Sequence, residues 1–283
     1  MLTTTIYVKF VPLAGANYSG DISMTSPGAI TRTISLTGTG VVDVAPVYTP
    51  AEIFLNQNVP LIGEIGEPYS ALLTANFVQN DAGVIAQIKI QKDGSDIDLI
   101  TGDDELITTD SGFYDAVPIQ FRAYADYAAG PLKNYSPSGN IDLRAALVRN
   151  INAPQAAEVN FASSIITLTG ELYVFYGSSP AAPTDSSDVR ILPVKISSSQ
   201  AIAGVFYYNT LPVYQHHSIC IPNARTLVKV IDITAGNVDI TASFINNPFT
   251  VDDLTGNPNA YKNYTYSPGS TFPFPHQLQI TIS

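Results

Sequence analysis

The sequence has little charge and no tryptophan. Only 13% of its residues are Asp, Glu, Lys or Arg, whereas globular chains usually carry roughly 25%. Disordered acidic chains are rich in charge and poor in aromatic residues, but this chain carries 16 Tyr and 12 Phe. The composition therefore excludes a disordered chain. It favours a soluble, globular all-β protein whose faces are solvated by hydroxyl and amide groups.

Basic residues are especially scarce. The chain has 13 Lys and Arg against 24 Asp and Glu, a formal net charge of −11, and no run of basic residues. Binding to a phosphate backbone requires clustered Lys and Arg. We therefore expect no nucleic-acid partner.

A single cysteine, Cys220, excludes an internal disulfide. Because Ile219 and Ile221 flank it, we predict a small buried hydrophobe rather than a reactive thiol. No apolar run approaches the roughly 18 residues of a membrane helix, so no membrane insertion is expected. The N-terminal MLTTTIYVKFVP lacks the basic and apolar regions of a signal peptide, which predicts assembly in the cytoplasm. Whether Met1 is the natural start stays open.

Motifs for catalysis and metal binding are also missing. There is no GxSxG elbow and no P-loop. His216 and His217 are adjacent, so on a strand they point to opposite faces, and we predict loop or sheet-rim positions rather than a metal site. The run Asp103-Asp104-Glu105 lacks the spaced ligands of a calcium loop and is predicted to be a solvated turn. We expect no metal, no cofactor and no enzymatic activity, although a spatial pair of carboxylates, as in glycosidases, stays open.

What the sequence does contain is apolar residues that alternate with a period of two. Ile6, Val8 and Phe10 share one face of a predicted strand, and Leu278, Ile280 and Ile282 share one face of another near the end of the chain. Such alternation predicts half-buried strands, and closely spaced turn signals predict sandwiches. The predicted fold class is all-β, with tandem Ig-like β-sandwich domains, a C-terminal β-sandwich domain and few short helical turns.

Four segments are predicted from the turn and proline signals. Residues 1–45 form a partial Ig-like anchoring segment of three strands, too thin a sheet to be stable alone. Residues 46–60 are a linker with a short strand at 53–55. Residues 61–170 form an Ig-like β-sandwich. Residues 171–283 form a C-terminal β-domain that is the candidate receptor-binding domain.

Individual elements are predicted within these domains. The stretch LYVFYGSSPAAPTDSSDVRILP, residues 172–193, is predicted to be a hinge between domains, with a helical turn at 186–192 that carboxylates cap. The segment NIDLRAALVRN, residues 140–150, fits a helix or a strand. Strands are predicted at 69–77, 85–92, 99–109, 118–127, 161–168, 204–208, 218–221, 226–233, 247–251, 261–266 and 277–282.

Aromatic residues gather in the C-terminal domain. Most are expected to fill the core and to pair across strands. Tyr beside Asn and Ser on loops is also the chemistry of adaptable recognition surfaces, so a carbohydrate or a protein is the expected ligand. The candidate ligand-binding residues are Tyr207, Tyr208, Tyr214, Phe272 and Phe274.

Several stretches resemble known families. YVKFVPLAGANYSGDISMTS and ITRTISLTGTGV resemble the closing half of Ig-like repeats in bacterial surface proteins. FYGS, PTD, VRIL, SICIP, VIDITAGNVDITASF and AYKNYTY resemble the terminal domain of fibre and tail proteins from phages and prophages of Bacteroidetes-type hosts. IGEIGEPYSALLTANFVQNDAGVIAQIKIQKDG resembles the Ig-like module that precedes that domain.

The resemblance to phage fibres implies a virion structural protein, a fibre or decoration protein assembled in the host cytoplasm. It implies an elongated homotrimer whose N-terminal segment binds other virion proteins. The C-terminal domain would then contact a host surface glycan or protein. Tail fibre, head fibre and capsid decoration stay open. The alternatives are a bacterial surface adhesin with Ig-like domains, which requires export, and a capsule-degrading fibre enzyme.

Overall fold

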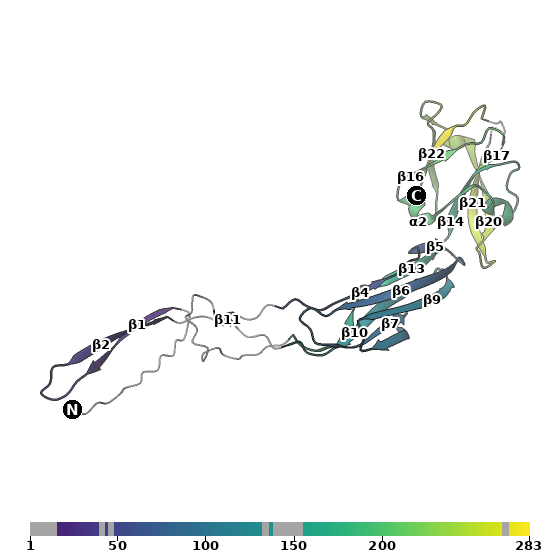
Figure 1. Cartoon of the computed structure of the whole chain (residues 1–283). Helices are drawn as coiled ribbons and strands as arrows, with labels where there is room; N and C mark the ends of the chain where they lie inside the picture. The colour runs from purple at the N-terminus through teal and green to yellow at the C-terminus, as the bar shows by residue number, and fades with distance from the viewer. Residues whose placement is uncertain are drawn as a thin grey trace. The chain divides into compact units, whose positions relative to one another are not determined.

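The computed structural model describes residues 16–39, 43–44, 48–131, 136–137, 155–214, 216–267 and 272–283 (Figure 1). Strands dominate these ranges, and their only α-helices are the five-residue α1 (Ser186–Arg190) and α2 (Ser198–Ile202). The predicted all-β, sandwich-type fold with few helical turns is confirmed. None of the described helices has the length and hydropathy needed to cross a membrane.

The chain divides into two compact units. The first comprises Met1–Glu52, Val78–Ala86 and Asp126–Val159. It contains the antiparallel hairpin of β1 (Asn17–Met24) and β2 (Arg32–Thr39), in which Ile22 pairs with Ile34. It also contains the short ladder between β3 (Asp43–Val44) and β11 (Ser136–Pro137).

Two of the three strands predicted in residues 1–45 are present in the hairpin, but they are exposed rather than half-buried. In the turn between them, Gly28 has a φ of +80°. The third predicted strand, at 6–10, and the predicted helix or strand at 140–150 lie outside the described residues. Both hairpin strands are largely exposed, and Ile30 and Ile34 expose 85% and 50% of their surface. The described hairpin thus presents apolar side chains to solvent.

The second unit comprises Ile53–Phe77, Gln87–Ala125 and Asn160–Ser283. Its first part is a β-sandwich of two sheets, and the buried faces carry small and large apolar residues such as Leu73 and Phe121. The smaller sheet has three strands in the order β4 (Glu52–Asn56), β6 (Pro68–Val78) and β9 (Glu105–Phe113). The larger sheet has the order β5 (Ile62–Glu64), β13 (Ile166–Glu171), β10 (Ile119–Tyr127), β7 (Ile85–Lys92) and β8 (Ser95–Thr101). Its sixth strand, β12 (Glu158–Ala162), pairs with β10.

Two strand predictions in the sandwich are wrong in the same way. The predicted strand at 99–109 is two strands, because Gly102 takes a φ of +71° and reverses the chain between β8 and β9. The predicted strand at 161–168 is likewise divided between β12 and β13. The pair Asp93-Gly94, a dipeptide typical of tight hairpin turns, connects β7 to β8: the two residues have φ angles of +51° and +82°, the pattern of a type I′ hairpin.

The C-terminal part of the second unit is a second pair of sheets. Its strands agree with the predicted strands at 204–208, 218–221, 226–233, 247–251, 261–266 and 277–282. The five-stranded sheet has the order β15 (Val194–Ser197), β14 (Tyr173–Ser179), β17 (His216–Pro222), β21 (Pro258–Tyr266) and β20 (Phe244–Asp252). The four-stranded sheet has the order β16 (Val205–Asn209), β22 (Gln277–Ile282), β18 (Leu227–Asp232) and β19 (Val238–Asp239).

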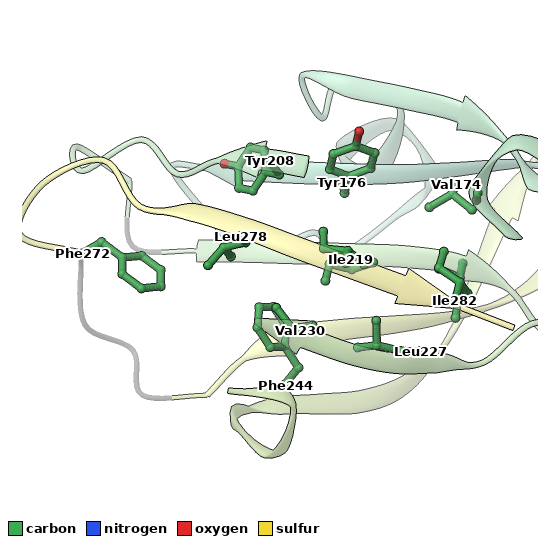
Figure 2. Packing of buried hydrophobic residues seen from close by; sticks show 13 residues of the cluster. Val174, Tyr176, Tyr208, Ile219, Leu227, Val230, Phe244, Phe272, Leu278 and Ile282 are labelled. Atoms are coloured by element: carbon green, nitrogen blue, oxygen red, sulfur yellow. The ribbon is translucent and has the colours of Figure 1, made fainter. Parts of the chain in front are cut away.

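One apolar core lies between these two sheets, and Figure 2 shows its side chains converging from both. The alternation predicted for the last strand is confirmed, since Leu278, Ile280 and Ile282 are all buried in this core. Full burial of one such side chain contributes about 1.5–3 kcal/mol. The last strand is therefore an integral part of the fold.

A second, smaller core lies on the other face of the five-stranded sheet and contains Phe175, Val189 and Cys220. Helix α1 covers this face. Its N-cap is Asp185, which accepts a hydrogen bond of 3.1 Å from the Asp188 backbone N–H. The predicted helical turn is therefore confirmed, and a carboxylate caps it as expected.

The sandwich and the C-terminal part are joined through a buried carboxylate. Glu64 of β5 accepts from Arg190 Nη2 at 2.7 Å and from Lys195 Nζ at 3.1 Å. The backbone adds a bond of 3.2 Å from the Leu254 N–H to the Ile65 carbonyl. Two cations from α1 and β15 thus stabilise one buried anion, and each keeps part of its surface in water.

Candidate functional site

The five aromatic residues predicted to bind a ligand fall into two groups. Strand β16 alternates, so Tyr208 is buried in the core while Tyr207 exposes 52% of its surface. Phe272 is also buried in the core. Phe274 is exposed, and Tyr214 is half-buried. Two of the five therefore face the interior, and the other three keep at least part of their side chains on the surface.

The loops that follow β16 and precede β22 lie side by side. The Thr210 N–H donates to the His276 carbonyl at 2.8 Å, and the His276 N–H donates to Thr210 Oγ1 at 2.9 Å. These loops carry Val213 and Phe274, which expose 79% and 53% of their surfaces. The two loops thus meet at one end of the C-terminal part, where Val213 and Phe274 form an exposed apolar tip.

A serine and a histidine meet in the core of the C-terminal part. Ser178 Oγ lies 2.8 Å from His217 Nδ1, contacts the Tyr208 hydroxyl and accepts from the Leu211 N–H at 3.1 Å. A hydroxyl beside an imidazole is the arrangement of a nucleophile and its base. Here Ser178 and His217 are both buried. The cluster connects β14, β16 and β17 through side-chain contacts.

The two histidines of the predicted pair have different environments. His216 begins β17 and is half-buried, as a rim residue would be, whereas His217 is fully buried, so the rim prediction is wrong for it. Burial lowers the pKa of His217 to about 4, with a smaller contribution from His216. Among the described residues, no group of three His, Cys, Asp or Glu side chains is placed to hold a metal ion.

An open groove lies in the C-terminal part beside α1 and the edge strand β20. Its volume is about 830 Å³. Hydroxyl, amide and carboxylate side chains predominate in it, beside the half-buried ring of Phe249. The groove is lined by Thr184, Asp185, Ser186, Asn223, Asn246, Pro248, Phe249, Thr250, Asp252, Ala260, Tyr261 and Lys262.

Part of this lining is fixed by internal hydrogen bonds. The Asp252 N–H donates to Ser186 Oγ at 2.9 Å, and Arg190 Nε donates to the Asp252 carbonyl at 2.9 Å. Lys262 Nζ donates to the Arg225 carbonyl at 2.7 Å. The backbone around the groove is therefore held in place before any ligand arrives.

Other polar groups of the groove are available to a ligand. Within the described residues, the side chains of Asn223, Asn246 and Asp252 make no intramolecular hydrogen bond, and the two asparagines are exposed. Two amides and a carboxylate provide donors and acceptors at separate points. They match a ligand that presents several hydroxyl groups, such as a saccharide.

Sequence reasoning missed the groove because its lining comes from separate stretches of chain. Strands β20 and β21 pair with Phe249 opposite Tyr261, and α1 reaches them only after the chain has folded. Along the sequence, the groove residues are visible only as short runs of polar residues, such as Asn246 and Asn247. Nothing in the sequence placed them beside Asp252 and Asn223.

Cys220 is expected to be inert in the folded protein. Burial raises its pKa to about 12, so almost no thiolate, the reactive form, is present near neutral pH. An aromatic disulfide reagent should label Cys220 only after unfolding in urea, and the release of the chromophore measures this. Stoichiometric labelling of the native protein within minutes would contradict both the burial and the pKa.

Comparison of the chain with protein-family models, with curated proteins and with solved structures finds no match in any of the three. Function has to be inferred from the residues and the geometry of the chain itself.

Proposed function

We propose that the protein is a bacteriophage virion structural protein, a fibre or decoration protein whose C-terminal domain attaches to the host surface. The groove beside α1 and β20 carries this proposal, because it offers unpaired amide and carboxylate groups on a hydrogen-bonded frame. The resemblance of the C-terminal sequence to terminal domains of phage fibres supports the virion context. The low charge and all-β architecture are in keeping with such a fibre.

The ligand we propose is a neutral surface glycan. Sugar hydroxyls donate to the Asp252 carboxylate and exchange hydrogen bonds with the amides of Asn223 and Asn246. The apolar face of a sugar ring can lie against the Phe249 side chain. The net charge of −11 repels polyanionic capsules at long range.

The N-terminal hairpin is proposed to bind other virion proteins. Ile30 and Ile34 are exposed in it, and a two-stranded hairpin is marginally stable alone. Pairing with another subunit of the particle would cover this apolar surface. The particle is proposed to assemble in the host cytoplasm with the protein as a homotrimer.

The attachment is proposed to be binding without catalysis. The buried Ser178–His217 contact is closed to substrate, and the groove holds the carboxylates of Asp185 and Asp252. Asp185 accepts the capping bonds of α1, which leaves one carboxylate instead of the pair that glycosidases use. Incubation with host polysaccharide should release no oligosaccharides.

Asn246→Ala is expected to weaken adsorption of the purified protein to host cells by roughly tenfold, the loss of one or two ligand hydrogen bonds. Asn247→Ala is the matched control, because Asn247 is the next residue of β20, is also exposed and does not line the groove. Fluorescently labelled protein bound to cells in suspension measures the effect. Equal adsorption by the two variants would exclude the groove as the binding site.

Two further measurements test the proposal as a whole. Phe274→Ala, at the apolar tip, should leave adsorption unchanged; a loss there instead would place binding at the loops predicted from the sequence. Antibody labelling of purified virions should place the protein on the particle. Virions that contain none of it would overturn the proposed function.

A further inference from the structure

Arg190 connects the sandwich to the groove of the C-terminal part. Its Nη2 lies 2.7 Å from Oε1 of Glu64, which belongs to strand β5 of the sandwich. Its Nε donates to the carbonyl of Asp252, a residue of the groove, at 2.9 Å, and Nη2 bonds the same oxygen. One guanidinium therefore bonds a carboxylate of the sandwich and the backbone of the groove.

Helix α1 holds Asp252 at both of its backbone groups. The Asp252 N–H donates to Ser186 Oγ at 2.9 Å, and the Asp252 carbonyl accepts from Arg190. Ser186 is the first residue of α1 and Arg190 is the last. Because α1 and β20 both contribute to the lining of the groove, these bonds fix the two elements against each other at Asp252.

Glu64 determines where the Arg190 guanidinium lies. The Glu64 side chain exposes only 3% of its surface, and each of its oxygens has a separate cation, with Lys195 Nζ 3.1 Å from Oε2. A buried carboxylate without counter-charges is strongly disfavoured by desolvation. Folding of the sandwich against the C-terminal part therefore draws Arg190 to a defined position.

The two cations have similar surroundings apart from the groove. Arg190 Cζ lies 5.5 Å from the centre of the Phe175 ring, and Lys195 Nζ lies 5.4 Å from the centre of the Tyr173 ring. Both rings belong to β14, and both attract a cation to their faces. Within the described part of the chain, Lys195 bonds Glu64 but no residue of the groove. Only Arg190 transmits the position of Glu64 to the groove.

The backbone that follows Asp252 is also packed against the sandwich. The Leu254 N–H donates to the Ile65 carbonyl at 3.2 Å, and a Cβ built on Gly66 lies 2.8 Å from the backbone nitrogen of Thr255. The turn after β5 thus touches the loop after β20. The end of β20 at Asp252 is held from the sandwich by a side chain and by this backbone contact.

We propose that Glu64 is a positioning residue for the groove, acting through Arg190 on Asp252. The inference rests on the proposed function, in which the Asp252 carboxylate accepts hydrogen bonds from a neutral glycan. Glu64 fixes the guanidinium at the Asp252 carbonyl, and so fixes the backbone from which the Asp252 side chain projects. It also balances the charge of Arg190, which leaves the Asp252 carboxylate free for the ligand.

Loss of the Glu64 charge should block this acceptor. By covalent geometry the Asp252 carboxylate lies close to its own carbonyl oxygen, to which Arg190 already donates. An Arg190 without its counter-ion is attracted to that carboxylate. An internal ion pair then occupies the groups that would accept from sugar hydroxyls.

Adsorption of the purified full chain to host cells tests the proposal. Glu64→Gln should weaken adsorption about fivefold, at the lower end of couplings between distinct sites. Gln has nearly the same size and keeps an acceptor oxygen, so the packing around position 64 is preserved. Lys195→Gln is the matched control, because it removes the other ion pair of Glu64 without touching the groove; it should adsorb like the wild type.

Hydrogen exchange at the Asp252 amide gives a second measurement that needs no ligand. In the wild type this N–H is bonded to Ser186 Oγ, and Glu64→Gln should speed its exchange several-fold because α1 is held less firmly. Lys195→Gln should exchange like the wild type. If Glu64 only stabilised the contact between the sandwich and the C-terminal part, adsorption and exchange in both variants would follow their midpoints of urea unfolding, and that result would overturn the proposal.

Arg190→Lys keeps the proposal testable even if Glu64→Gln fails to fold. Lysine keeps a charge for Glu64, but a single ammonium replaces the fork that bonds Glu64 and Asp252 together. Faster exchange at Asp252 and weaker adsorption are expected again. Native Arg190→Lys protein with wild-type exchange and adsorption would overturn the proposal.

The proposed function fails by a different result. Wild-type protein that does not adsorb to host cells overturns the proposed function, whereas faster exchange at Asp252 in Glu64→Gln still supports the positioning by Glu64. Loss of adsorption in Asn246→Ala, together with wild-type adsorption and exchange in native Glu64→Gln, supports the groove and rejects only the role of Glu64.

Discussion

Gly177→Ala is expected to lower the free energy of unfolding of the C-terminal part by about 2–5 kcal/mol. Gly177 has a φ of +155° on β14, a conformation that L-residues with a side chain rarely adopt. A Cβ built there lies 2.3 Å from Cδ and 2.4 Å from Cγ of Pro193. The substitution therefore combines backbone strain with a clash against the rigid ring of Pro193, which lies between α1 and β15.

Gly204→Ala is the matched control for this prediction. Gly204 lies in the same part of the chain, and a Cβ built on it has no atom within 4 Å. We expect its midpoint of urea unfolding to stay close to that of the wild type, or to rise slightly because alanine restricts the unfolded chain. Tyrosine fluorescence and near-ultraviolet circular dichroism follow the transition, since the chain has no Trp.

A double variant tests the physical cause of the loss. Pro193→Ala removes the ring atoms that a Cβ at position 177 meets, so the two substitutions together should cost less than their sum. The remaining cost of Gly177→Ala in that background measures the backbone strain alone. A midpoint of urea unfolding for Gly177→Ala equal to that of the wild type would contradict the packing of Pro193 on β14.

Elements with strong local signals could be predicted from the sequence. The Asp93-Gly94 turn needs two positive φ angles, which few other pairs of residues adopt readily. The final strand alternates strictly, and Asp185 caps α1 through its own side chain. Each of these features depends on a few neighbouring residues, so the sequence carries the information locally.

Other features depend on contacts that the sequence does not show. Tyr207 and Tyr208 are chemically alike and adjacent, so alternation indicates that only one faces outward but not which one. His217 is polar, yet its partners in the core come from other parts of the chain: Ser178 from β14 and Phe272 from the segment before β22. The groove has the same origin, because its free amides and carboxylate meet only through sheet pairing.

His217 should make the protein less stable in mild acid. Its pKa is lowered from 6.5 to about 4 in the folded chain, mainly because burial disfavours the charged imidazolium. Between those values the unfolded chain binds a proton that the folded chain does not, so stability falls as the pH falls. The stabilisation is fully present above about pH 6.5 and is lost by about pH 4, a change on the order of 3 kcal/mol.

The surroundings of His217 give no compensation for that charge. Its Nδ1 faces Ser178 Oγ, Nε2 has no hydrogen-bond partner among the described residues, and the Phe272 ring centre lies 4.9 Å from the imidazole centre. The buried carboxylate of Asp232 is bonded to another histidine, with its Oδ2 2.6 Å from His276 Nδ1. Protonation of His217 therefore places a positive charge between a hydroxyl and aromatic rings.

Urea unfolding at intervals from about pH 7 to pH 4 measures this effect. His217→Gln lowers stability at neutral pH through imperfect packing, but its unfolding free energy should change much less with pH over the same interval. His216→Gln, altered at the neighbouring half-buried residue, should keep the wild-type slope. All other residues are the same in the three proteins, so their contributions cancel from the comparison. A wild-type slope in His217→Gln would show that His217 is not the source of the acid sensitivity.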